Sequence, residues 1–172
     1  MAFDTYMQID GGSKVKGEAK AKGLEGEGWF EIFSFSFGAS NPTTVGSSSG
    51  GLSAGKVSVS SFNVMKKSEG ASATLFGACC TGEHYKKATV VLRKATGDSG
   101  KQQTFLQYDF TDLMVESIQW SGSNGGDDTP AESVSFAFAS VTITYYKQDS
   151  DTGAMTKDNT ASWDLTTVGV VS

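Results

Sequence analysis

Residues 133–146 read Ser-Val-Ser-Phe-Ala-Phe-Ala-Ser-Val-Thr-Ile-Thr-Tyr-Tyr, and this stretch decides the fold class. Its large apolar residues occupy even positions from 134 to 138 and odd positions from 141 to 145. Successive side chains of a strand point to opposite faces, so each half predicts a strand with one apolar face. The change of parity at Ala139-Ser140 predicts a β-bulge that bends the strand, as the closure of a barrel requires.

Similar segments, rich in β-branched and aromatic residues, occur along the chain and are separated by Gly- and Ser-rich turns. The further strands that this pattern predicts are 5–9, 29–37, 56–64, 87–94, 101–110, 113–120 and 163–165. Within 29–37, Phe33, Phe35 and Phe37 are expected on one face, and Ser34 and Ser36 on the other. The sequence therefore predicts a mostly antiparallel β-barrel or β-sandwich.

Residues 68–82 have a different period and predict the one helix. Leu75, Phe76, Cys79 and Cys80 recur at helical spacing, which predicts an apolar face made partly of two buried thiols. A serine at position 68 or 72 is expected to cap the start of the helix, and Gly82 to end it. This helix is expected to pack against one side of the strands.

Residues 38–55 form the longest stretch without a strand or helix pattern, and they consist largely of Gly, Ser and Thr. A loop of this length in a compact domain is usually functional or disordered. The 38 residues that precede it are too few to bury a separate core. We therefore expect a single domain over residues 1–172 with one long extended loop.

The charge and hydropathy of the chain exclude two classes of partner. The net charge is −5 and the 14 basic residues are scattered, so we expect no nucleic-acid partner. No apolar run approaches the roughly 20 residues of a membrane span, so we expect no membrane insertion. Asp4 and Asp10 interrupt the region where a signal peptide would be apolar, which predicts synthesis in the cytoplasm and, if the protein is exported, a route that accepts the folded chain.

The residues that carry most enzyme chemistry are scarce. His84 is the single histidine, and Cys79 and Cys80 are adjacent and cannot easily converge on one metal ion. Residues 50–57 resemble a phosphate-binding loop but have Val57 where a hydroxyl should bind Mg²⁺. Residues 149–153 read better as a hairpin tip than as a calcium loop. We therefore expect no catalysis, metal or cofactor, and predict a binding or assembly module.

Several segments share the pattern of a known family. Residues 80–95 carry the patterns Gly-x-His-Tyr and Leu-Arg-Lys-Ala, and they are the most specific. The segments 1–9, 33–38, 51–59 and 132–146 follow the same family in order and spacing. Over nearly its whole length the chain resembles the tube protein family of type VI secretion, the hemolysin-coregulated protein (Hcp) family.

The resemblance implies an antiparallel β-barrel with one short helix alongside. It also implies a homo-hexameric ring, with rings that stack into a tube inside a contractile sheath. Such a tube is fired out of the cell with a spike and effector proteins, and its lumen can hold effectors beforehand. The subunit would be cytoplasmic before firing and then secreted without a cleaved signal peptide. The alternative is a monomeric β-sandwich that binds carbohydrate or protein.

The resemblance also assigns roles to two groups of residues. The long loop is expected to contact a neighbouring ring through Asn41, Ser47, Ser48, Ser49, Gly50 and Gly51. Ser36, with Ser34 beside it, is expected to face the lumen and contact effectors. The alternatives are that the loop is an ordinary mobile loop and that the serines face solvent or pack at a strand end.

Overall fold

The computed structural model describes residues 2–12, 14–46, 51–96, 101–126 and 128–171. Within these ranges the strands are β1 (Asp4–Ile9), β2 (Phe30–Ile32), β3 (Ser34–Ser36), β4 (Ala39–Ser40), β5 (Thr43–Val45), β6 (Leu52–Ala54), β7 (Ser58–Val59), β8 (Phe62–Lys67), β9 (His84–Ala95), β10 (Gln102–Ser121), β11 (Ala131–Ala137), β12 (Ser140–Gln148) and β13 (Met155–Asp164). The helices are the short 3-10 turn η1 (Asp10–Gly12) and α1 (Ser72–Thr81). No helix in the described ranges is both long enough and apolar enough to span a membrane.

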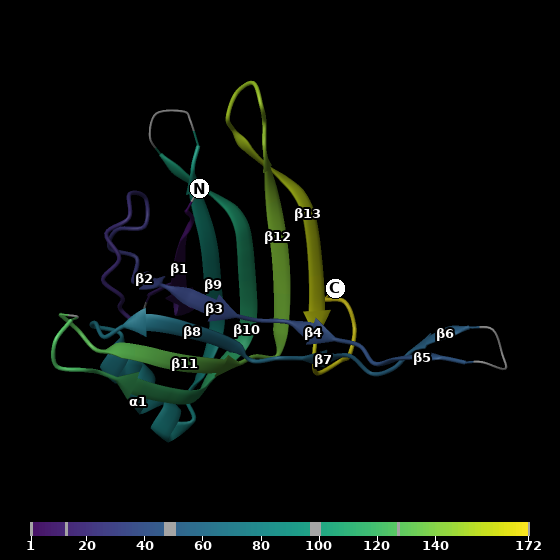
Figure 1. The fold of residues 1–172 in the computed structure, drawn as a ribbon, viewed down its shortest axis with the longest axis horizontal. Helices are drawn as coiled ribbons and strands as arrows, with labels where there is room; N and C mark the ends of the chain where they lie inside the picture. Colours follow the sequence, from purple (N-terminus) through teal and green to yellow (C-terminus); the bar gives the residue numbers. More distant parts are fainter. Residues whose placement is uncertain (1, 13, 47–50, 97–100, 127, 172) are drawn as a thin grey trace.

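A closed circuit of antiparallel pairings forms the body of the molecule (Figure 1). The pairings run β2-β1-β9-β10-β11-β8-β3. β2 and β3 are consecutive parts of one bent segment, separated by Phe33, whose N–H donates to the Met65 carbonyl at 2.8 Å. The pairing therefore returns to the strand where it began, which confirms the antiparallel barrel.

β12 and β13 extend the sheet beyond the barrel (Figure 1). The first half of β10 pairs with β12 and its second half pairs with β11. Between the halves lies Asp112, with a φ of 51°, a left-handed conformation that aspartate tolerates better than most residues. The two strands predicted at 101–110 and 113–120 are thus one strand of 20 residues that turns at Asp112.

The bend predicted at Ala139-Ser140 is present and is sharper than a bulge. β11 ends at Ala137 and pairs with β8 inside the barrel, whereas β12 begins at Ser140 and belongs to the extension. The Ala139 N–H donates to the Thr111 carbonyl at 2.9 Å, which holds the corner against β10. The change of parity therefore marks the point where the chain leaves the barrel.

Aromatic rings fill the barrel. Phe62 and Phe110 lie with ring centroids 4.9 Å apart, and Phe110 and Phe138 with centroids 4.7 Å apart. Phe37 contacts the rings of both Phe62 and Phe110 at its edge of this cluster. Phe33 is 52% exposed, so the prediction that it shares a buried face with Phe35 and Phe37 was wrong. It occupies the bend between β2 and β3, where the alternation is interrupted.

Helix α1 packs on β10, and its start differs from the prediction. The capping residue is Ala71, without a side-chain hydrogen bond, so neither predicted serine is the N-cap. Gly82 ends the helix as predicted, with a φ of 68° and its N–H donating to the Ala78 carbonyl at 2.9 Å. Leu75 and Ala78 are buried, but Phe76 is half exposed. The apolar face is thus narrower than predicted.

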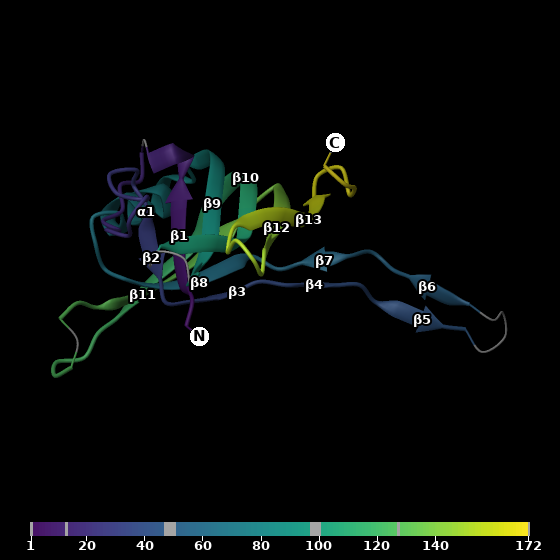
Figure 2. The same ribbon diagram turned by 90° about the horizontal axis from the view of Figure 1, so that it is seen from above.

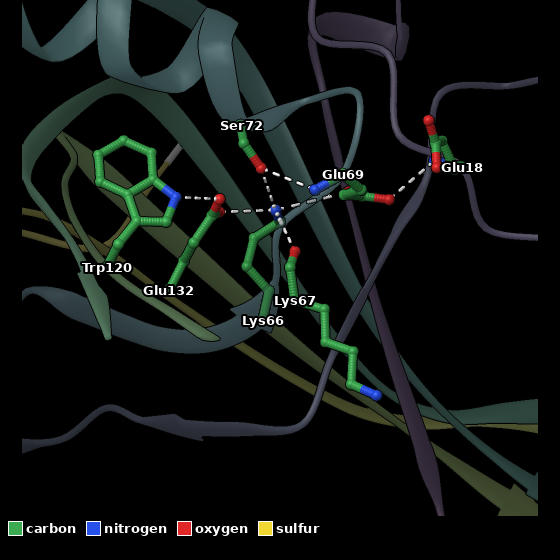
Figure 3. A network of polar contacts seen from close by, with 7 residues as sticks. All are labelled: Glu18, Lys66, Lys67, Glu69, Ser72, Trp120 and Glu132. Atoms are coloured by element: carbon green, nitrogen blue, oxygen red, sulfur yellow. Dashed lines mark hydrogen bonds and ion pairs between the residues drawn. The ribbon is translucent and has the colours of Figure 1, made fainter. Parts of the chain in front are cut away.

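A buried ion pair joins the helix to the barrel (Figure 3). Lys66 on β8 and Glu132 on β11 are fully buried, and their Nζ and Oε2 atoms lie 2.9 Å apart. The Lys66 ammonium also donates to the Lys67 carbonyl at 2.8 Å and to the Ser72 hydroxyl at 3.2 Å. The Trp120 indole donates to the other oxygen of Glu132 at 2.6 Å. Both buried charges therefore have several partners, as charges in an apolar interior need.

The surroundings shift the two nearby carboxyl groups in opposite directions. Burial alone would raise the pKa of Glu132, but hydrogen bonds from Lys66 and Ser72 together outweigh it, and the pKa is lowered. Burial raises the pKa of Glu69, whose Oε1 lies 3.6 Å from the Lys66 ammonium. Lys66 is thus committed chiefly to Glu132.

Replacing Lys66 by Met tests the ion pair. Lys66→Met leaves the Glu132 carboxylate buried without its cation, so the free energy of unfolding should fall by about 3–5 kcal/mol in chemical denaturation. Lys67→Met, at the next and exposed position, should change it by no more than about 0.5 kcal/mol. The double variant Lys66→Met/Glu132→Leu removes both charges and should recover most of the loss. A loss in Lys66→Met as small as that of its control would contradict the ion pair.

The lowered pKa of Glu132 predicts a loss of stability in acid. A carboxyl group with a depressed pKa contributes stability that is present above its unfolded pKa, about 4.3, and is lost as the pH falls through the folded value. The native chain should therefore lose more free energy of unfolding below about pH 4.3 than Lys66→Met/Glu132→Leu. Glu69 remains in both proteins, and its raised pKa acts in the opposite sense. Equal losses, measured by denaturation over a pH series, would refute this assignment.

Candidate functional site

An extended arm projects from the barrel between β3 and β8 (Figures 1 and 2). β4 pairs with β7 near its base and β5 pairs with β6 further out. The Gly55 N–H donates to the Pro42 carbonyl at 2.7 Å between the two pairs. A Cβ atom on Gly55 would lie only 2.8 Å from that carbonyl oxygen, so the close approach requires glycine. The prediction that 38–55 lacks regular structure was therefore wrong for the described part.

The arm has no core of its own. All described residues from Ala39 to Lys56 are exposed. Val45 and Leu52 face each other across the two strands, and each is 78% exposed. An isolated two-stranded hairpin is marginally stable in water, and exposed apolar pairs add nothing to it until they are covered. The arm therefore has the features of a contact element for another surface.

The loop residues predicted to contact a neighbouring ring can be compared with this arm. Asn41 lies between β4 and β5, and Gly51 immediately precedes β6, and both are exposed. Ser47, Ser48, Ser49 and Gly50 lie outside the described residues. The pattern missed Val45 and Leu52, although two apolar residues in a run of Gly, Ser and Thr were the available signal.

Ser34 and Ser36 lie on the outward face of β3, opposite the partly buried Phe35. β3 pairs with β8, β8 with β11, and β11 with the second half of β10. Paired residues point to the same side of a sheet, so the serines belong to two cross-strand rows. We call these rows the serine face; they are Ser34-Met65-Ser133-Gln119 and Ser36-Asn63-Ser135-Ser117.

The serine face consists mainly of hydroxyl and amide groups. Its eight residues include no charged side chain. Glu116, at the bulge of β10, accepts a hydrogen bond from Ser135 at 3.0 Å and places one carboxylate at its border. Met65 supplies an exposed apolar group in the middle. The face can hydrogen-bond many partners but offers no strong charge to select one.

The outer edge of β13 is a second unpaired surface. β13 pairs with β12 on one side, and no strand in the described ranges pairs with its other side. Residues 156–161 are exposed. An open edge presents unpaired N–H and C=O groups that can pair with another chain. This edge is therefore a candidate contact between copies of the chain.

The residues weighed for chemistry are dispersed. No three His, Cys, Asp or Glu side chains in the described part of the chain are arranged to hold a metal ion. His84 begins β9 and is exposed. Cys79 and Cys80 are free thiols, one partly buried and one exposed, so the prediction of two buried thiols was wrong. The Asp149 carboxylate accepts the Thr152 N–H at 2.8 Å and the Asp151 N–H at 2.9 Å, which confirms the hairpin tip. These bonds lower the pKa of Asp149.

Comparisons with known proteins agree with this architecture. The family model described as "Type VI secretion system effector, Hcp" matches residues 6–145. Protein hcp1 of Pseudomonas aeruginosa is 33% identical over 96 residues, which are 56% of this chain and 57% of that relative. The match thus spans little more than half the length of that relative.

Solved structures extend the similarity to the whole chain. The structure of a type six secretion system protein is similar with a TM-score of 0.86 at 34% identity, covering 99% of this chain and 100% of the other. Hcp1 from Salmonella typhimurium is similar with a TM-score of 0.74 at 29% identity, again over 99% and 100% of the two chains. The barrel, the helix and the matching sequence together place the chain in the Hcp family of type VI secretion, a family of structural secretion-system proteins.

Proposed function

We propose that this chain, as a single domain over residues 1–172, is the subunit of a type VI secretion tube. It assembles into homo-hexameric rings that stack on one another and carry effector proteins through the lumen. The observation that carries the proposal is the arm, whose exposed Val45 and Leu52 have no partner within the described chain. An arm of this kind gains stability when a second copy covers it.

A ring places two requirements on the subunit. Its interfaces are heterologous, so one patch on each copy must fit a different patch on the next. The open edge of β13 supplies one such patch, because a strand edge can add to a neighbour through main-chain hydrogen bonds. The arm projects away from the barrel and can reach beyond its own subunit (Figure 2). The molecule therefore offers separate elements for closing a ring and for stacking rings.

We assign the serine face to the lumen. A channel that passes different cargo proteins needs a surface that forms weak hydrogen bonds with any of them. The eight uncharged residues of the serine face, with Ser34 and Ser36 among them, meet this need. The implied partners are effectors inside the tube, a spike at its end and a sheath around it. No catalytic activity, nucleic-acid partner or membrane insertion forms part of the proposal.

The proposal has a consequence for location. The subunit folds in the cytoplasm, assembles there, and leaves the cell with the tube without cleavage of a signal peptide. Native mass is the first test, because six copies of the 18.1 kDa chain give a particle of about 109 kDa. A stable monomer at micromolar concentration would instead favour a β-sandwich module that binds carbohydrate or protein.

The arm can be tested by removing its two exposed apolar groups. Val45→Ser/Leu52→Ser should leave single rings intact and weaken ring stacking by at least about tenfold, since each side chain loses its burial against the next ring. Sedimentation velocity and electron microscopy of purified rings measure this. Thr43→Ser in the same strand is the control and should stack normally. Tubes of unchanged length in the double variant would rule out this role for the arm.

The serine face can be tested by adding charge and bulk at one position. Ser36→Arg should abolish co-purification of a small type VI effector that is co-expressed with the chain, because an extended cation replaces a small hydroxyl. The native mass should stay that of the ring. Ser150→Arg, at the tip of the β12–β13 hairpin, is the matched control and should retain the effector. Effector capture by Ser36→Arg at the level of its control would place the lumen elsewhere.

A further inference from the structure

A basic pocket lies where the segment after β1 meets the start of β10. Its lining residues are Lys22, Gly23, Arg93, Lys101 and Gln102, and its volume is about 550 Å³. Three of the 14 basic residues of an acidic chain thus converge on one hollow, and no carboxylate lines it. Like charges repel, so three cations around one cavity are stable when an anion lies between them.

The geometry of Arg93 gives the pocket a fixed floor. One terminal nitrogen of its guanidinium donates to the Lys22 carbonyl at 3.2 Å, and the other donates to the Gln102 carbonyl at 2.8 Å. These bonds hold the guanidinium between two segments of the chain. They use two of its five N–H donors, so others are left for a ligand. Arginine held in this way loses little conformational freedom when it binds an oxyanion.

The loop beside Arg93 is shaped to leave the guanidinium accessible. Gly23 has a φ of 86°, and a Cβ atom at that position would lie 4.0 Å from the nearer terminal nitrogen of Arg93. Glycine therefore avoids both a strained backbone and a side chain against the guanidinium. Lys22 and Lys101 are exposed, so their ammonium groups can move to meet a ligand.

The two nearest carboxylates are engaged elsewhere. Asp4 accepts a hydrogen bond from the Gln102 side chain, and Glu25 accepts one from the Gly23 N–H at 2.6 Å. Backbone hydrogen bonds lower the pKa of Glu25, so it remains ionised while it fixes the loop. Both groups hold the lining residues in place rather than filling the pocket.

We propose that this pocket binds a phosphate group. Three cationic side chains can surround a tetrahedral dianion, and each can form charge-assisted hydrogen bonds to its oxygens. A carboxylate has one negative charge and two oxygens, and it leaves at least one of the three cations without a partner. The volume lies within the range of small-molecule pockets, about 300–1,000 Å³, so a phosphate ester fits as well as free phosphate. This site is independent of the tube function proposed above.

Isothermal titration calorimetry of the purified chain in a phosphate-free buffer tests the proposal. Inorganic phosphate should bind the native protein, and Lys22→Gln/Lys101→Gln should weaken binding by at least about tenfold. The control Lys147→Gln/Lys157→Gln removes the same charge from the β12–β13 hairpin and should bind phosphate normally. Equal weakening in the two double variants would mean that only net charge attracts the anion, and it would overturn the site, as would no binding to the native protein.

Two further titrants distinguish the ligand. Acetate should bind at least about tenfold more weakly than phosphate, and acetate binding as strong as phosphate binding would overturn the assignment to phosphate. Phenyl phosphate probes the remaining volume of the pocket. Tighter binding of phenyl phosphate supports a phosphate ester as the ligand, and equal binding supports free phosphate. Both variants carry exposed substitutions, so circular dichroism is expected to show the native fold in each.

Discussion

The buried pair of Lys66 and Glu132 fixes the register on which the lower half of the barrel depends. The two residues are direct cross-strand partners in the β8–β11 pairing. A shift by one residue would turn one charge to solvent and leave the other buried alone, at a cost of several kcal/mol. With the register fixed, Ser133 and Ser135 must lie beside Met65 and Asn63. The composition of the serine face is therefore a consequence of an interaction on the opposite side of the same strands.

The sequence predicted those parts of the fold that follow from period and turn chemistry. The parity change at Ala139-Ser140 located the corner between barrel and extension, and Gly82 located the end of the helix. Lys66 was not predicted, because the strand pattern ended at Val64 and a lysine in such a position normally faces solvent. It continues the strand to Lys67 because Glu132 and Ser72 satisfy its charge inside. That information lies 66 residues away in the sequence.

The candidate surfaces show the same division. The outward orientation of Ser34 and Ser36 follows from alternation with Phe35, and the structure places both on the exposed face. Their neighbours on β8, β11 and β10 depend on strand pairing, which the sequence alone does not reveal. The arm was expected to lack structure because its strands are only two or three residues long, too short for a periodic signal. Thr43, Val45 and their partners become strands through pairing with each other.

The arm is joined to the barrel at two strands whose registers are set independently. β3 is held by its pairing with β8, and β8 is also held by its pairing with β11. Residues inserted into or deleted from the arm therefore do not shift any strand of the barrel. Doubling the length of a flexible loop costs only about 0.6 kcal/mol, so the arm can change in length and composition during evolution while the body stays constant. The same insertion within β8 would separate Lys66 from Glu132. Divergence between related chains is consequently directed to the arm, which makes it the part of the subunit through which two such assemblies can become incompatible.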